Sequence, residues 1–323
     1  MTPATVSRVL NQKQRFSTSQ EVRDRILATA DKIGYVPNLA ARNLNRGMTK
    51  IVGVFASPLT HIGEGINESL LEGMRSVMHA AGYDVFFELS ARSPRSHALP
   101  SWRFDGALLM QAPTAEAVAE LERRRVPFVA VNEIVPNAVA SILADDPMGT
   151  MQAVEHFASL GHRKIAYANA RATYFNHYSQ TERYETLVRA VKKYGMELAP
   201  GHDQPFGSPH EFLEHSVLRN GATGVLTYDH QIGVLISGAA ANLGLKIPQE
   251  CSLICFNDVY PVAIMPTPLT AVAVSGEEMG RIGADLLLKR LTSEKLRAKA
   301  HPIRVPESLV IRASTAPPRG KEL

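Results

Sequence analysis

The 323-residue sequence has two cysteines, one tryptophan and no long hydrophobic run. No stretch approaches the roughly 18 apolar residues of a membrane-spanning helix, and the first residues lack the apolar centre of a signal peptide, so we expect a cytoplasmic protein. Cys251 and Cys255 fall in one apolar run that is typical of a strand, where four residues span about 13 Å. A disulfide needs Cα atoms roughly 4.4–6.8 Å apart, so the sequence predicts two buried, unpaired thiols that hold no metal.

The charge of the chain is unevenly distributed. Hydrophobic residues make up 45% and charged residues 20% of a chain long enough for two or three domains. Residues 1–50 hold nine Lys or Arg and three Asp or Glu, a net charge of +6, which leaves −2 for the rest of the +4 chain. A small basic head on a near-neutral body indicates nucleic-acid binding, although a solvated basic surface is the simpler alternative.

The first eleven residues have the pattern of a helix that reads DNA. Thr2 is a good N-cap, and Pro3 is tolerated in the first turn. An apolar stripe at helical spacing is formed by Val6, Val9 and Leu10. Side chains that reach phosphates and base edges lie beside the opposite face, at Thr5, Ser7, Arg8 and Asn11. The sequence therefore predicts a recognition helix.

A second helix is predicted over residues 17–34, where Thr18 and Glu21 form a capping box and Gly34 ends the helix. Asn38 can then cap a short segment that closes at Gly47. Isolated helices shorter than about 12 residues are marginal in water, so residues 37–48 are a candidate hinge that folds only on binding.

From residue 50 onward, apolar runs alternate with segments of helical spacing, which predicts an α/β body with parallel sheets. The pattern restarts after Asp145-Asp146-Pro147 and gives two similar lobes with a cleft beyond the carboxyl ends of the strands. We expect one lobe to contain 49–145 and 275–304, and the other to contain 146–274 and 305–318. The expected strands are 51–56, 84–89, 106–110, 127–131, 164–168, 224–228, 251–256, 270–274 and 309–312. The expected helices from residue 148 onward are 148–160, 181–194, 209–219, 231–243 and 276–291.

Seven short motifs in order along the chain carry a resemblance to a known family. They are Pro-Ala-Thr-Val-Ser-Arg-Val-Leu-Asn (3–11), Gly-Tyr-Val-Pro-Asn (34–38), Ala41 with Leu44, Gly-His-Arg-Lys-Ile (161–165), Gly-Leu-Lys-Ile-Pro (244–248), Phe-Asn-Asp (256–258) and Pro-Leu-Thr (268–270). Together they resemble the lactose/galactose repressor (LacI/GalR) family of bacterial transcription regulators over essentially the whole chain. The resemblance implies a homodimer that reads a pseudo-palindromic operator, with a periplasmic-binding-protein-like body that binds a small effector, such as a sugar or sugar derivative.

The resemblance also implies which residues contact DNA. Pro3, Ala4 and Arg8 match base-facing positions, and Thr5, Ser7 and Asn11 match backbone-facing ones. In the hinge, Leu44 matches an apolar wedge that kinks the duplex, and Ala41 and Asn38 lie beside it. A phosphate contact for Arg8, and packing of Leu44 on its own domain, are the alternatives. A helix-turn-helix needs a helix before the recognition helix, so we expect a partial motif over residues 1–36 that binds operator weakly.

The resemblance is less direct for the residues that would bind the effector. Arg183 resembles the family's effector-binding arginine, whereas Asn132 and Asn257 stand where acids are common. Further candidates are Ser57 after the first strand and the Tyr228-Asp229 pair. A pocket with fewer acids suits a neutral polyol or a ligand with one negative charge. Helix capping is as good an interpretation for Asp229 and Asp258, and a structural role is the better one for His156 and His162.

Two other functions compete with this hypothesis. A sugar-binding receptor without DNA binding fits the body alone, but an exported receptor needs a signal peptide. A nucleotide-dependent enzyme would explain Gly63 and Gly65 after the first strand, but Glu68 stands where the fingerprint needs its third glycine. The chain has neither a phosphate-binding Gly-rich loop nor a nucleophile elbow. We therefore expect a protein that is not an enzyme and has no cofactor.

Overall fold

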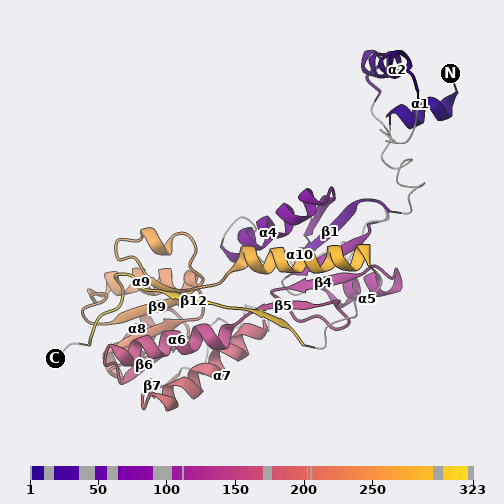
Figure 1. Ribbon diagram of the computed structural model, residues 1–323. Coiled ribbons are helices and arrows are strands. Elements are labelled where there is room, and N and C mark those ends of the chain that lie inside the picture. The colour runs from indigo at the N-terminus through magenta and orange to yellow at the C-terminus, as the bar shows by residue number, and fades with distance from the viewer. Residues whose placement is uncertain are drawn as a thin grey trace. The chain divides into compact units, whose positions relative to one another are not determined.

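The computed structural model describes residues 2–10, 18–35, 48–56, 65–89, 104–110, 113–169, 177–201, 203, 206–293 and 301–318. The chain separates into two compact units, Met1–Lys50 and Ile51–Leu323, each of which is described by itself (Figure 1). Among the helices of these described segments, none is long and apolar enough to cross a membrane.

The described part of the first unit contains two helices, α1 (Pro3–Leu10) and α2 (Gln20–Lys32), which pack through Val9 and Ile26. The hydroxyl oxygen of Thr2 accepts a hydrogen bond from Thr5 N, so the predicted N-cap of α1 is confirmed. The predicted capping box of α2 is wrong by one residue, because Ser19 rather than Thr18 accepts from the backbone at Val22. Gly34 ends the helix at φ +62°, a conformation that costs glycine little.

One sheet of the second unit is entirely parallel. Its strand order is β11-β5-β4-β3-β1-β2. These strands are β1 (Ile51–Ala56), β2 (Asp84–Leu89), β3 (Gly106–Met110), β4 (Phe128–Val131), β5 (Ser141–Ala144) and β11 (Ile303–Val305). The helices of this lobe are α4 (Ile66–Ala80), α5 (Ala115–Arg123) and α10 (Gly276–Thr292). Helices α4 and α10 touch backbone to backbone, since a Cβ on Gly73 would lie 2.0 Å from Glu277 O.

The other sheet has the order β12-β10-β9-β8-β6-β7 and is parallel except for the antiparallel β10–β12 pair. Its strands are β6 (Lys164–Ala168), β7 (Glu197–Leu198), β8 (Gly224–Thr227), β9 (Ser252–Phe256), β10 (Thr270–Ala273) and β12 (Ser308–Val310). The helices around it are α6 (Asp146–Ser159), α7 (Tyr178–Lys193), α8 (Pro209–Leu213) with a π-helical turn (Glu214–Arg219), and α9 (His230–Asn242).

The chain passes between the two lobes three times, as Figure 1 shows. The passages lie between β5 and α6, between β10 and α10, and between β11 and β12. They are tied to one another, because Asp145 N donates to Val305 O at 2.9 Å and the Ser275 hydroxyl donates to Pro306 O at 3.4 Å. Polar groups near these passages therefore lie close to both lobes.

The predicted fold class is confirmed, and the expected strands recur with their ends shifted by a few residues at most. Three strands were missed, β5, β7 and β11, because each has only two to four residues and no alternating pattern. The predicted helix 209–219 is wrong as a single α-helix, since its second half is π-helical. Cys251 and Cys255 are buried and unpaired, as expected.

Candidate DNA-binding face and effector site

Helix α1 separates its apolar and polar positions as the sequence predicts. Val9 is buried against α2, whereas Pro3, Ala4, Ser7 and Arg8 are exposed and Thr5 is half-buried. The helix therefore presents a small polar face with one guanidinium. Five other predicted site residues lie outside the described residues: Asn11, Asn38, Ala41, Leu44 and Ser57.

Two predicted effector residues have a backbone reason to be asparagine. Asn132 follows β4 at φ 57° and Asn257 follows β9 at φ 68°. Asparagine adopts this left-handed region more readily than most residues, because its short polar side chain can bond locally. The asparagines at these two strand ends therefore also allow the chain to turn sharply there, independently of any ligand contact.

The first turn of α7 joins the two lobes at Asn132. His177 Nε2 donates to Asn132 O at 2.8 Å, and the hydroxyl of Tyr178 donates to Asn132 Oδ1 at 2.9 Å. The same hydroxyl accepts from Ala144 N at 3.1 Å, at the end of β5. Helix α7 belongs to the lobe of β6, whereas β4 and β5 belong to the other sheet. These contacts therefore hold one lobe against the other.

A chain of hydrogen bonds continues from His177 into the second lobe. His177 Nε2 carries the proton donated to the carbonyl of Asn132, and the other ring nitrogen, Nδ1, lies 2.7 Å from the Ser179 hydroxyl. Ser179 Oγ in turn lies 2.9 Å from the hydroxyl of Tyr228. Burial raises the pKa of Tyr228, so this phenol remains a donor at neutral pH. Asn132 and Tyr228 are thus linked through His177, the N-cap of α7, and Ser179 in its first turn.

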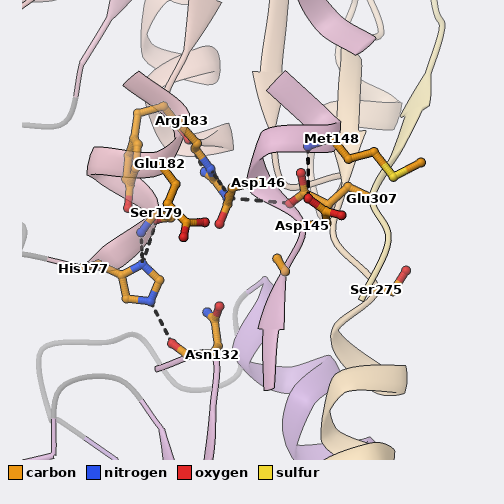
Figure 2. Close-up of polar contacts among 12 residues, drawn as sticks. Asn132, Asp145, Asp146, Met148, His177, Ser179, Glu182, Arg183, Ser275 and Glu307 are labelled. Carbon is orange, nitrogen blue, oxygen red and sulfur yellow. Dashed lines mark hydrogen bonds and ion pairs between the residues drawn. The ribbon is translucent and has the colours of Figure 1, made fainter. Parts of the chain in front are cut away.

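Arg183, one and a half turns further along α7, is buried, and its guanidinium lies beside Asp146 (Figure 2). Its Nε donates to Asp146 Oδ1, and its Nη1 donates to Tyr228 O at 2.6 Å. The guanidinium also stacks on Phe256, 3.9 Å from the ring centroid. Burial opposes its charge, but the adjacent carboxylate of Asp146 more than compensates, and the pKa of Arg183 is raised.

Glu307, on the third passage between the lobes, is the second carboxyl beside Arg183. Its Oε1 lies 4.0 Å from Arg183 Nη2, and its side chain is fully buried. Burial raises the pKa of Glu307 to about 8, the negative charge of Asp146 adds to the increase, and Arg183 opposes it. Glu307 is therefore mostly protonated at neutral pH.

Asp229 and the two histidines have structural partners. Asp229 Oδ1 accepts from Ile232 N at 2.8 Å and caps α9, as the capping interpretation predicts. His162 lies between the hydroxyls of Thr223 and Ser252 and the carbonyl of Ala316, and burial lowers its pKa to about 4. His156 contacts the Thr315 hydroxyl at 3.0 Å. The structural interpretation of both histidines is confirmed.

Asp258 does not cap a helix, because its carboxylate pairs with Arg312 at 2.8 Å. Sequence reasoning missed several residues of the site altogether. The Asp145-Asp146-Pro147 run was a signal for a strand-to-helix junction, but nothing in the sequence pairs Asp146 with Arg183 or brings in Glu307. The contribution of His177 and Tyr178 depends on a contact between two sheets, which local patterns do not encode.

An apolar groove of about 1640 Å³ lies on the surface of the second unit, along α4, β2 and the start of α9. Leu235 and Tyr260 line it and are 51% and 79% exposed. A groove with large exposed apolar side chains is typical of a protein–protein interface.

Two family models match this sequence. A model described as bacterial regulatory proteins, lacI family, matches residues 1–38, and a periplasmic binding protein-like domain matches residues 154–315. The chain is 25% identical to the HTH-type transcriptional repressor MelR of Bacillus subtilis (strain 168), covering 96% of this chain and 93% of that protein. It is also 25% identical to the HTH-type transcriptional regulator GntR of Escherichia coli (strain K12), over 93% and 91% of the two chains.

Among solved structures, the chain is similar to a lac repressor dimer bound to operator and the anti-inducer ONPF. That likeness has a TM-score of 0.78 and 22% identity and covers 97% of this chain and 95% of the other. It extends over both units of the sequence and supports the two-lobed fold. The relatives named above are transcriptional regulators rather than enzymes.

Proposed function

The chain belongs to the LacI family of bacterial regulatory proteins, and on this premise we propose that it is a homodimeric repressor controlled by a small molecule. Two α1 helices read the half-sites of a pseudo-palindromic operator, and a sugar or sugar derivative binds between the lobes. The observation that carries this proposal is the exposed polar face of α1, joined in one chain to a two-lobed body.

Operator reading is assigned to the exposed face of α1, with Arg8 donating to a guanine edge. The test is selection from a random duplex library, followed by fluorescence anisotropy on the selected and a scrambled duplex. We expect Arg8→Ala to lose about 1–3 kcal/mol on the selected duplex and to relax the preference at one base pair. Arg219→Ala, which removes an equal charge from an exposed site of the body, is the control.

An equal loss on the selected and scrambled duplexes would show that Arg8 contacts phosphate only. If selection yields no preferred sequence, the repressor function is refuted and a receptor without DNA binding is favoured. Leu44→Ser tests the proposed wedge, and it should weaken specific binding more than nonspecific binding.

Dimerisation is assigned to the apolar groove beside α4 and α9, with a second copy of the chain as its occupant. Stable interfaces bury large apolar side chains, and Leu235 and Tyr260 are otherwise left in water. Leu235→Arg should produce monomers in sedimentation velocity. Leu218→Arg, at a position 56% exposed and outside the groove, should leave the dimer intact. A dimer that survives Leu235→Arg contradicts this assignment.

Effector control is assigned to the α7 contacts with Asn132 and Ala144, because they depend on how the lobes approach each other. Closing or opening the cleft changes these contacts and thereby the separation of the two hinges. Coupling of this kind is worth about 1–3 kcal/mol and is reciprocal, so operator DNA must change effector affinity by the same factor. Equal effector affinity with and without operator, measured by titration calorimetry, would refute the mechanism.

A further inference from the structure

One asparagine in the sequence is directly followed by a glycine, in the pair Asn220-Gly221. The backbone nitrogen of the glycine can attack the side-chain carbonyl carbon of the asparagine, because glycine has no side chain to hinder the approach. The new C–N bond closes a succinimide ring, and the side-chain nitrogen leaves as ammonia together with the proton of the glycine amide. Water then opens the ring at either carbonyl, so the product is an aspartate or an isoaspartate.

The structure places this pair at the end of a π-helical turn. The turn comprises Glu214–Arg219, directly after α8, and Asn220 follows it as the C-cap at φ −100° and ψ 0°. It is the only π-helical segment among the residues that the structure describes. Such segments are rare and frequently lie at functional sites. Gly221 is exposed and Asn220 is half-buried, so water reaches the pair.

Both reacting groups of the pair are held in hydrogen bonds while the turn is folded. The side-chain nitrogen of Asn220 donates to His215 O at 2.8 Å, which directs the amide back along the chain. Gly221 N donates to Val217 O at 2.9 Å, so the attacking nitrogen keeps its proton and faces a different carbonyl. The ring can therefore close only after both hydrogen bonds have broken.

The turn is anchored to the protein through one face. Val217 is 7% exposed and packs in the core of the second lobe, whereas Leu218, the next residue, is 56% exposed. The neighbouring strand β8 is buried along its whole length. A segment with few buried apolar contacts and exposed backbone hydrogen bonds opens at a lower free energy than the sheet beside it. Opening of the turn is therefore expected while the rest of the lobe remains folded.

We infer that Asn220 and Gly221 form a deamidation site that the π-helical turn holds closed, so that the modification marks chains in which this turn has opened. The change is irreversible. The product has a carboxyl group where the amide donated to His215 O, and an isoaspartate also lengthens the backbone by one methylene group. A negative charge at the C-terminal end of a helix is unfavourable as well. This inference concerns a covalent modification and does not depend on the proposed repressor function.

The experiment compares the full chain in its native state with the same chain unfolded in guanidinium chloride, both incubated at pH 8.5 and 37 °C. Proteolysis at acidic pH after Glu214 and Glu250 releases residues 215–250, and mass spectrometry measures the exchange of the amide for a carboxyl group. Deamidation of Asn220 should be at least about tenfold slower in the native chain, which corresponds to an opening free energy of at least about 1.4 kcal/mol.

Asn242 lies in the same proteolytic fragment and is an internal control, because the leucine that follows it hinders the attack. It should keep its amide in both states.

Two matched variants test whether the turn itself provides the protection. Val217→Ala removes buried packing inside the turn, and it should raise the native rate at least about threefold. Val225→Ala makes the same change on β8, outside the turn, at a residue that is 0% exposed. It should leave the native rate within about twofold of wild type, because the turn opens without the sheet.

Three results would overturn the inference. The native chain could deamidate at Asn220 as fast as the unfolded chain, the unfolded chain could keep this amide, or Val217→Ala could accelerate the native chain no more than Val225→Ala does. The comparison of native with unfolded wild type needs no variant, so it decides the question even if Val217→Ala fails to fold. Operator binding is measured separately, so failure of the repressor function leaves this test unaffected.

Discussion

Replacing Glu307 with glutamine should change how the stability of the protein depends on pH. The ordinary pKa of a glutamate in the unfolded chain is near 4.5, whereas burial raises that of Glu307 to about 8 in the folded protein. Between these values the folded state holds a proton that the unfolded state has released. Glu307 therefore contributes stability that is fully present below pH 4.5 and is lost as the pH rises toward 8.

The magnitude follows from the interval between the two pKa values. Each pH unit between the two pKa values changes the free energy of unfolding by about 1.4 kcal/mol, so the three units from pH 5 to pH 8 correspond to a maximal loss of about 4 kcal/mol. Relaxation around a buried charge reduces such effects, and we expect a loss of about 2–4 kcal/mol in wild type relative to Glu307→Gln. The charged groups facing Glu307 are Asp145 and Asp146 at the N-terminus of α6, and Arg183 and Glu182 on α7.

The assay is urea unfolding of the full chain at half-unit intervals from pH 5 to pH 8.5, with wild type and Glu307→Gln in parallel. The difference between the two proteins cancels titrations that both share. Glu278→Gln is the control, because its carboxylate is exposed and its pKa is lowered by Arg281, away from this pH range. A difference between wild type and Glu307→Gln that stays constant within about 0.5 kcal/mol would show that Glu307 does not titrate as its burial requires.

Three further predictions concern packing and the contact between lobes. Gly280→Ala should lower the free energy of unfolding in urea by at least about 1–3 kcal/mol, because its Cβ would lie 2.1 Å from a backbone oxygen of α4. The control is Gly238→Ala in α9, whose Cβ meets nothing within 4 Å, and this variant should be neutral or stabilising. Similar losses in the two variants would contradict the close contact between α4 and α10. Glu182→Gln and Arg304→Ala should each change the effector affinity measured by calorimetry, because the two side chains pair between the lobes. The affinity of the double variant should match that of the single variants. Additive effects would show that this pair does not act as a unit. Asp229→Ala should lower the free energy of unfolding by about 0.5–2 kcal/mol, because it removes the cap of α9. Asp229→Asn keeps a capping oxygen and should retain most of that stability. Equal losses in the two variants would indicate an effect of charge instead.

Local sequence patterns predicted most of the fold because apolar runs and helical spacing are properties of neighbouring residues. Strands such as β1 and β3 were found to the residue, since continuous apolar runs indicate burial on both faces of a sheet. The short strand β11 was missed because it is held by pairing with β5, about 160 residues earlier in the chain. The same limit applied to the site, where Arg183 was identified but its partner on the third passage was not.

The sequence by itself determined the α/β class, the polar face of α1, the free buried cysteines and the strand ends where the candidate effector residues lie. Only the tertiary structure decided what those residues face. Arg183 is charged in any conformation, but the carboxyl groups that lie beside it, those of Asp146 and Glu307, reach it from two separate passages between the lobes. Charge compensation in a buried site acts through space over a few ångströms, and the order of residues along the chain does not record such distances.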